Sequence, residues 1–518
     1  MNMKSLTKEE KSVRKYLASL LVLGLFVAFF AVAVGIQPQA DAKPDYGSNC
    51  ASCHNGTVAP KLGGSTAPAP KPAPKPAPAK STTTKPASNA APAKTAKPAA
   101  PKEEPVKITV EGKAVKGFKL NGTVYASVKE YAAAMNYNLS WNGEKQIVTL
   151  SDYNTALEIY LLNGLIKYRG KDNKIASMTK DGASYVDIKG ITELTHGKIT
   201  EQNNVYTVRK SSKTFAWEQS GHNFDLKAAE RMATNDACLK CHNGLANIDT
   251  TKKYADLNAQ APIGCNTCHG ESKAVKDLRG AKPYVTPYGM EIDAGAGTVC
   301  INCHNINRPL NNFAGLYAEY RAPHQGPQAE VLFATGGFEF GERAYERSPH
   351  GAIEDTCVTC HMAKQDDEYG PVGGHTFKVA SGDVQNLNAC TSCHADLKDL
   401  NRRALADYDG DKKLEGIQDE IHGLLEELKE AIKEKYQLVD LIDKSGRIMF
   451  VTDNTDPANP KGLEAGKVSE NDYKAAFNYF LIEADGSEGI HNPAYAVQLL
   501  QQSYKAVTGH DVPNAVIR

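Results

Sequence analysis

The twelve cysteines of this chain fall into six pairs, and two residues separate the members of each pair. A histidine follows every pair, so the unit Cys-x-x-Cys-His occurs six times and no cysteine is left over. Two thiols at this spacing can each form a thioether with one vinyl group of a porphyrin, and the next residue can then bind its iron. Zinc sites and disulfides also use paired cysteines, but neither explains the six following histidines. The pattern predicts six covalently bound haems c.

The residues predicted to hold these haems are the cysteines and the proximal histidines of the six motifs. They are Cys50, Cys53 and His54; Cys238, Cys241 and His242; Cys265, Cys268 and His269; Cys300, Cys303 and His304; Cys357, Cys360 and His361; and Cys390, Cys393 and His394. Each iron also needs a second axial ligand, because without one its other face stays open. Imidazole is the usual partner, so the histidines outside the motifs are the first candidates. The candidate distal ligands are His222, His324, His350, His375 and His491.

The start of the chain indicates export. Residues 1–42 combine a basic stretch, an uncharged run over residues 17–36 and the small-x-small cleavage pattern Ala40-Asp41-Ala42. The run nearly spans a bilayer, so this segment is either a cleaved signal peptide or an uncleaved membrane anchor. Both alternatives predict an extracytoplasmic protein, either secreted or associated with the cell envelope. The 518 residues carry no net charge, which argues against a nucleic-acid-binding protein.

Composition divides the rest of the chain into four segments. Residues 43–58 surround the first motif and contain little else. Residues 59–106 are rich in Pro, Ala and Lys and cannot form a core, so we expect a disordered linker. This linker is either a passive spacer or a tether that carries the first haem through an envelope. Residues 107–210 form a small module without cysteine, and residues 215–518 hold the other five motifs.

The module at residues 107–210 contains one pattern twice, a strand, a turn, a strand and a helix. Asn121-Gly122 and Asp181-Gly182 are the two hairpin turns. The segment resembles the copper amine oxidase N-terminal-like domain of many secreted bacterial proteins. That resemblance implies an α+β fold with a binding or spacing role, and one histidine, His196, does not provide a copper site.

The order of motifs in residues 215–518 resembles that of the pentahaem ammonia-forming cytochrome c nitrite reductases. Gly221-His222 precedes the first motif of this segment, and the histidine-bearing loops and later motifs follow in the order of those enzymes. The resemblance implies that four histidines are distal ligands of low-spin haems, and that the first haem of the enzymes has an open face. The four are His222, His350, His375 and His491.

Three departures from those enzymes concern the first haem. His242 replaces their proximal lysine, and the stretch from Asn305 to Arg308 lacks their pocket tyrosine. Arg321-Ala322-Pro323 precedes His324, so the calcium-binding glutamine of the enzymes is missing as well. His324 is therefore either a pocket acid beside an open iron or the sixth ligand that closes it. We favour the closed iron.

Two further patterns lie near the C-terminus. Apolar residues recur at helical spacing from Leu414 to Ile432 and predict a long amphipathic helix that faces either the core or a second chain in a homodimer or higher assembly. Just before it, acidic residues at alternate positions resemble the first half of a calcium-binding loop, with a solvated turn as the alternative. The candidate calcium ligands are Asp407, Asp409, Asp411, Lys413 and Glu420.

Together these patterns predict a multidomain protein with a mainly α multihaem cytochrome c domain. We expect short helices and loops around stacked haems, little ordinary core and a long C-terminal helix, next to the α+β module and the linker. The expected function is electron transfer across the envelope to a partner cytochrome or an extracellular acceptor. The alternative is a nitrite or hydroxylamine reductase with an open haem at Cys238 and Cys241 and His324 in its pocket. A third hypothesis makes the module a scaffold that binds the cell wall, so the sequence leaves open whether the protein is an enzyme.

Overall fold

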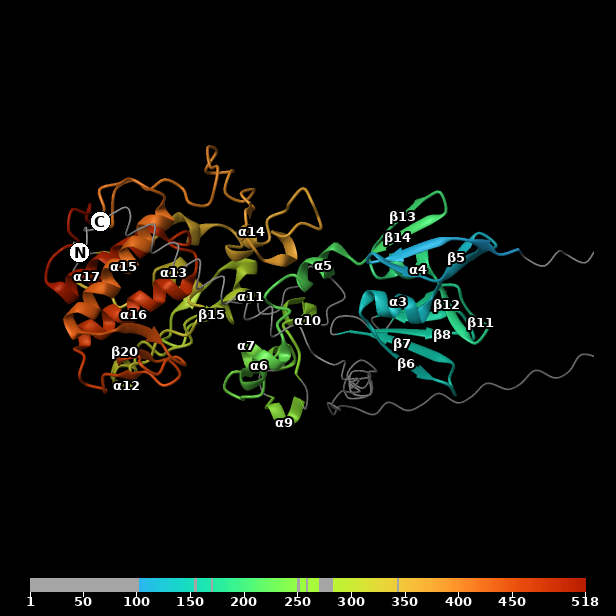
Figure 1. The fold of residues 1–518 in the computed structure, drawn as a ribbon, viewed down its shortest axis with the longest axis horizontal. Coiled ribbons are helices and arrows are strands. Elements are labelled where there is room, and N and C mark those ends of the chain that lie inside the picture. The colour runs from blue at the N-terminus through green and yellow to red at the C-terminus, as the bar shows by residue number, and fades with distance from the viewer. Residues whose placement is uncertain are drawn as a thin grey trace, which may run out of the picture. The chain divides into compact units, whose positions relative to one another are not determined.

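The computed structural model describes residues 102–152, 156–168, 171–248, 252–257, 260–269, 283–341 and 344–518 (Figure 1). The predicted leader, the motif of Cys50, Cys53 and His54, and nearly all of the linker lie outside these residues. In the ranges that the structure describes, no helix is both long enough and apolar enough to span a membrane.

The module contains the predicted duplication. In the first copy the strands β4 (Gly117–Leu120) and β5 (Thr123–Ser127) enclose Asn121 and Gly122, whose φ angles are 51° and 84°. The second copy repeats this turn between β11 (Ser177–Lys180) and β12 (Ala183–Asp187). Left-handed backbone at both turn positions is what tight hairpins require, and Asn or Asp followed by Gly supplies it at little strain.

A helix follows each hairpin and is capped in the same way. Ser127 caps α3 (Val128–Met135), and Asp187 caps α4 (Ile188–Leu194); each side chain accepts a hydrogen bond from a backbone amide of the first turn. Strands β5 and β12 pair with each other, so the two copies share one sheet. Tyr131, Leu150 and Ile188 are fully buried between the sheets and these helices.

Three sheets make up the module. Their orders are β1-β4-β5-β12-β11, β10-β9-β8-β7-β6 and β13-β14-β2-β3. The remaining strands are β1 (Glu104–Pro105), β2 (Lys107–Val110), β3 (Lys113–Val115), β6 (Asn138–Asn142), β7 (Ile147–Ser151), β8 (Ala156–Tyr160), β9 (Leu165–Tyr168), β10 (Lys171–Lys174), β13 (Lys198–Gln202) and β14 (Val205–Arg209).

The segment that carries the haem motifs consists of short elements. Its helices are α5 (Ser212–Glu218), α6 (Leu226–Ala233), α7 (Leu239–His242), α8 (Gly244–Ile248), α9 (Tyr254–Leu257), α10 (Cys265–His269), α11 (Thr298–Ile301), α12 (Phe313–Ala318), α13 (Gln328–Phe333) and α14 (Cys357–His361). Single 3-10 turns and two-residue strands complete it: η1 (Gly295–Gly297), η2 (Pro349–Ala352), η3 (Gly374–Thr376), β15 (Tyr284–Val285), β16 (Glu291–Ile292), β17 (Ala380–Ser381) and β18 (Val384–Gln385).

Three long helices follow, α15 (Ile417–Tyr436), α16 (Glu470–Asp485) and α17 (Pro493–Thr508) (Figure 1). The predicted amphipathic helix is α15, but it begins after Leu414, whose side chain is 43% exposed. Ile421, Leu424 and Leu428 are buried, and the helix packs against α16 and α17. The apolar stripe therefore belongs to the core of this chain and is not a free face for a second copy.

The expectation of little ordinary core is wrong for the C-terminal region. The three helices and the sheet of β19 (Asp440–Asp443), β20 (Ile448–Asp453) and β21 (Lys461–Gly462) enclose a large apolar core. Tyr320, Phe450, Tyr473 and Phe477 form an aromatic cluster inside it. No haem motif lies beyond residue 394, so the apolar side chains there pack against one another. The module has the predicted α+β fold, and the region after it combines helices with the short strands β15 to β21, so it is not built of helices alone.

Candidate haem sites

One turn of helix positions the residues of two motifs. Cys265 and Cys268 lie three residues apart on α10, and Cys357 and Cys360 do so on α14. Residues at this spacing share one face of a helix, so both thiols point to the same side and the following histidine stands next to them. None of the ten cysteines in the described part of the chain is joined to another by a disulfide. Among the same residues, no group of cysteines and histidines converges as a zinc site requires.

Every motif histidine of the described chain lies opposite one histidine from a distant segment. The distances between ring centroids are 6.2 Å for His242 and His324, 6.2 Å for His269 and His375, 6.2 Å for His304 and His222, 6.1 Å for His361 and His491, and 6.2 Å for His394 and His350. The structure thus brings all five candidate distal ligands to a motif histidine, and it gives each motif a different partner.

The uniform spacing of these pairs fits a metal ion between the rings. Two imidazole nitrogens that are each about 2 Å from one metal ion place their ring centroids roughly 6 Å apart. The angles between the ring planes range from 33° to 86°, although the spacing is constant to 0.1 Å. Direct ring-to-ring packing would couple angle and distance. Ligation of a metal ion would leave each ring free to rotate about its bond to the metal, which fits the varied angles at constant spacing.

The pair of His242 and His324 concerns the first motif of this segment. The loop of His324 is held in place, because the backbone amide of His324 donates to the Ile306 carbonyl at 3.1 Å. Ile306 is itself fully buried and lies two residues after His304, the histidine of the third motif of this segment. Tyr473 donates its hydroxyl to the Arg321 carbonyl at 2.7 Å and fixes the other end of the loop. The ring of His324 therefore covers the face of the site opposite His242.

Arg308 is a residue of this site that the sequence did not single out. Its Nε donates to the Ala322 carbonyl at 2.9 Å, two residues before His324. Burial lowers the pKa of Arg308, and the positive charge of Arg321 adds to that effect. Arg308 also contributes to lowering the pKa of His324, after the larger effect of burial. The pocket tyrosine of the resembling enzymes has no counterpart in this stretch, and the arginine braces the loop.

Burial favours the neutral form of several of these rings, which is the form in which an imidazole binds a metal. It lowers the pKa of His222 to about 4 and that of His375 to about 4. It also lowers the pKa of His242 and His394. His491 differs, because burial lowers its pKa but the carboxylate of Asp485 raises it by more.

Several of the rings are oriented by a hydrogen bond at Nδ1. His350 Nδ1 lies 2.8 Å from the Ile490 carbonyl, and His361 Nδ1 lies 2.9 Å from the Phe377 carbonyl. His491 Nδ1 lies 2.7 Å from Oδ1 of Asp485. A proton held at Nδ1 leaves the lone pair of Nε2 for a metal. These partners are backbone carbonyls or a residue with no motif around it, so no sequence pattern indicated them.

The motifs touch each other in an order that differs from their order in the chain. Sγ of Cys241 lies 3.9 Å from the Asn302 carbonyl, and Sγ of Cys303 lies 4.0 Å from the Lys240 carbonyl, so the first and third motifs of the segment lie side by side. The side chains of Cys300 and Cys357 lie next to each other and bring the third motif of the segment against the fourth. The third motif thus contacts both the first and the fourth.

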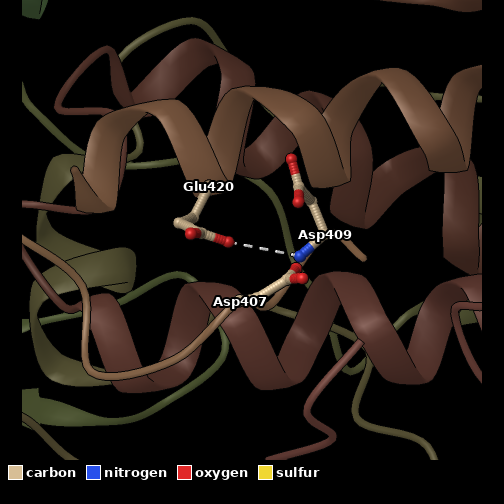
Figure 2. Close-up of side chains that lie close together, drawn as sticks. All are labelled: Asp407, Asp409 and Glu420. Carbon is tan, nitrogen blue, oxygen red and sulfur yellow. Dashed lines mark hydrogen bonds between the residues drawn. The ribbon is translucent and has the colours of Figure 1, made fainter. Parts of the chain in front are cut away.

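The acidic turn before α15 brings together three of its five predicted ligands (Figure 2). One carboxylate oxygen from each of Asp407, Asp409 and Glu420 lies within 4.8 Å of the others. Glu420 is 2% exposed and accepts the Tyr408 amide at 2.6 Å and the Asp409 amide at 3.3 Å. Burial, with Glu420 nearby, raises the pKa of Asp409 to about 6.

The other two predicted calcium ligands do not join this group. Asp411 and Lys413 form an ion pair with each other instead. Backbone amides donate hydrogen bonds to the carboxylates of the turn. The carboxylate of Asp407 accepts from the amide of Gly410 at 2.6 Å and from that of Lys412 at 2.9 Å. Hydrogen bonds within the turn thus account for its shape, and the five-ligand arrangement predicted for calcium is not formed.

Three family models match parts of the chain. Residues 336–513 match the model described as cytochrome c552, residues 107–213 match the copper amine oxidase N-terminal domain, and residues 196–270 match cytochrome c554 and c-prime. The sequence resemblance of residues 215–518 to multihaem cytochromes is confirmed, and so is that of residues 107–210 to the copper amine oxidase N-terminal domain. The matches support haem c as the cofactor. No curated protein sequence matches the chain.

Two solved structures are similar to the chain, and both are multihaem cytochromes. The outer cell wall cytochrome OcwA is 23% identical with a TM-score of 0.36, and the match covers 64% of this chain and 57% of that one. The undecahaem cytochrome from the S-layer of Carboxydothermus ferrireducens is 14% identical with a TM-score of 0.32, and the match covers 74% of this chain and 66% of that one. The chain thus spans less than two thirds of the length of either.

Proposed function

We propose that this protein is a six-haem cytochrome c that transfers electrons through bis-histidine haems to a partner cytochrome or an extracellular acceptor. The observation that carries the proposal is the pairing of His242 with His324 at 6.2 Å, the same spacing as in the other four pairs. A haem supplies a one-electron couple, and two imidazoles leave its iron without a site for substrate. The reductase alternative requires that site, and the ring of His324 stands in its place.

The residues of the chain have two tasks in this proposal. The paired cysteines attach each group covalently, and the five histidine pairs hold it from both sides. Neutral, buried rings keep the lone pairs available and exclude competing ligands. The contacts of the third motif with the first and the fourth support a relay in which electrons would pass between the haems held by these three motifs.

The proposal gives a role to each segment of the chain, including those that the structure does not describe. Residues 215–518 form the pentahaem domain, and residues 107–210 form the module. Residues 43–58 carry a sixth haem, and residues 59–106 link it to the main body. The basic start and uncharged run of residues 1–42 support export from the cytoplasm, by cleavage or by anchoring.

Electron paramagnetic resonance tests the proposal on the full-length chain. Cys50→Ala and Cys53→Ala together remove the N-terminal attachment site and leave five haems to be examined. We expect only low-spin ferric signals and no change on addition of nitrite or hydroxylamine. A high-spin signal equivalent to about one haem in five would show an open iron, and the reductase alternative would then replace the relay. A haemochrome assay of the unaltered chain should give six haems, and five in the double variant.

A further inference from the structure

His491 is distinguished from other paired histidines by the charge of its Nδ1 partner. His350 and His361 bond backbone carbonyls, and His304 Nδ1 lies 3.2 Å from the side-chain amide oxygen of Gln328. His491 bonds Oδ1 of Asp485 at 2.7 Å, and the side chain of Asp485 is 1% exposed. A neutral acceptor only orients a ring. A buried carboxylate also places a negative charge against it.

The structure maintains this carboxylate in an unfavourable place. Asp485 is the last residue of α16, where the partial negative charge of the helix end opposes a carboxylate. Burial of a charge is costly unless hydrogen bonds compensate for it. Two donors do so here, because Nδ1 of His491 serves Oδ1 and the hydroxyl of Ser487 serves Oδ2.

The same corner of the structure is fixed from the neighbouring motif. Nε2 of Gln328 donates to the backbone carbonyl of Asp485 at 3.0 Å, while its oxygen meets His304 Nδ1. One amide side chain therefore connects a histidine of the third motif to the helix end that carries the carboxylate. This bracing holds Asp485 at hydrogen-bonding distance from His491.

We propose that Asp485 is a positioning residue that lowers the reduction potential of the haem held by Cys357 and Cys360. The inference rests on the proposed function, in which His491 and His361 ligate that iron. A carboxylate that accepts a hydrogen bond from Nδ1 makes the imidazole a stronger electron donor to the iron. The negative charge of the carboxylate also favours the ferric state over the ferrous state. The reaction concerned is the gain or loss of one electron by the iron, and no atom is transferred.

The position of this haem gives the lowered potential a consequence. Its motif contacts the third motif through Cys300 and Cys357 and so lies inside the proposed relay. A low-potential haem next to the third motif passes electrons on and does not store them. Asp485 thereby sets where along the chain an electron rests.

A potentiometric titration of the full-length protein, followed by absorption and by electron paramagnetic resonance, tests this inference. In Asp485→Asn the share of the signal that belongs to one haem should move to a more positive potential, and the other haems should be unchanged. The expected change is at least tenfold in the ferric-to-ferrous ratio at a fixed potential, which is about 59 mV for one electron. In Ser487→Ala the same share should move to a more negative potential, because the carboxylate keeps its charge and loses its other donor.

Asp472→Asn is the matched control. Asp472 has a side chain that is also 1% exposed and lies in the first turn of the same helix, where it bonds Tyr436 and Lys435. Its replacement should leave every potential in place. Unchanged potentials in a low-spin Asp485→Asn protein would overturn the inference and leave the relay standing. If that variant does not fold, a positive shift or no shift in Ser487→Ala overturns it. High-spin iron in the Cys50→Ala, Cys53→Ala protein would instead contradict the proposed function itself.

Discussion

Removal of the His324 ring should open one iron and leave the other haems unchanged. In His324→Ala the backbone amide can still donate to the Ile306 carbonyl, and Tyr473 still holds the Arg321 carbonyl. The loop therefore keeps its position, and the space left behind has the volume of one imidazole. Since the ring faces His242 alone among the motif histidines, we expect one new open iron for each chain.

Carbon monoxide measures this number, because ferrous haem binds it only at an open face. We expect no binding to the Cys50→Ala, Cys53→Ala protein, and one molecule per chain once His324→Ala is added. Free imidazole should compete with the gas by refilling the vacated space. His422→Ala is the control, because the side chain of His422 is 68% exposed and pairs with Glu426 on the surface of α15. Stoichiometric binding before the change, or none after it, would refute the role of His324.

Three further changes test the fold around the sites. Phe450→Ala should lower the free energy of unfolding by about 3–5 kcal/mol in a urea titration, since Phe450 is fully buried against Tyr320, and it should leave the haem content unchanged. Burial raises the pKa of Glu330 to about 7, so the folded state binds the extra proton and stability falls as the pH rises from about 4.5 to 7. Titrations at pH 5 and pH 8 should show most of that loss, about 2–3 kcal/mol, in the parent protein but not in Glu330→Gln. Gly423→Ala should destabilise by about 1–3 kcal/mol despite the helix preference for alanine, because the added methyl group overlaps Oδ2 of Asp409; equal unfolding midpoints would contradict that crowding.

Local spacing was sufficient to find the haem motifs and their candidate ligands, because Cys-x-x-Cys-His is a chemical requirement within one turn of helix. Local spacing did not predict which distal histidine faces which motif histidine. His222 precedes the first motif of the domain by sixteen positions, yet its ring faces His304 of the third motif. That choice depends on how the loops cross, which is a property of the whole fold.

The helices illustrate a second limit. The one-sided stripe of α15 predicted the helix, although its start was missed because Gly416 begins the turn and Leu414 lies outside it. Helix α16 gave no such signal. Its residues from Ala475 to Ile482 are all buried, so the helix is covered on every side and has no polar face to produce a period. The core that surrounds it was therefore missed as well.

The acidic turn shows that a ligand spacing can have a second cause. Asp407, Asp409 and Asp411 alternate as calcium ligands do, but each accepts a backbone amide two to five residues further on. Short acidic side chains form such turns readily without a metal. Only Glu420, from the following helix, brings a carboxylate to the group from outside the turn.

The five histidine pairs also bear on how the chain folds, because each pair joins segments that are far apart in the sequence. His361 and His491 connect the fourth motif to the loop between α16 and α17, and His350 and His394 span the same motif from outside. The module and the C-terminal helices each have an apolar core of their own, built from buried side chains. The described segment between them contains short helices and a small apolar cluster around Ile292 and Ile301, while other side chains such as Tyr320 and Val331 join the C-terminal core. In the proposed function, bonds from the distal histidines to the haem irons would tie this segment together. Loss of a distal histidine should thus loosen the haem-bearing segment selectively while both cores stay folded, a difference that hydrogen exchange at Phe450 and Tyr131 against Ile301 would reveal.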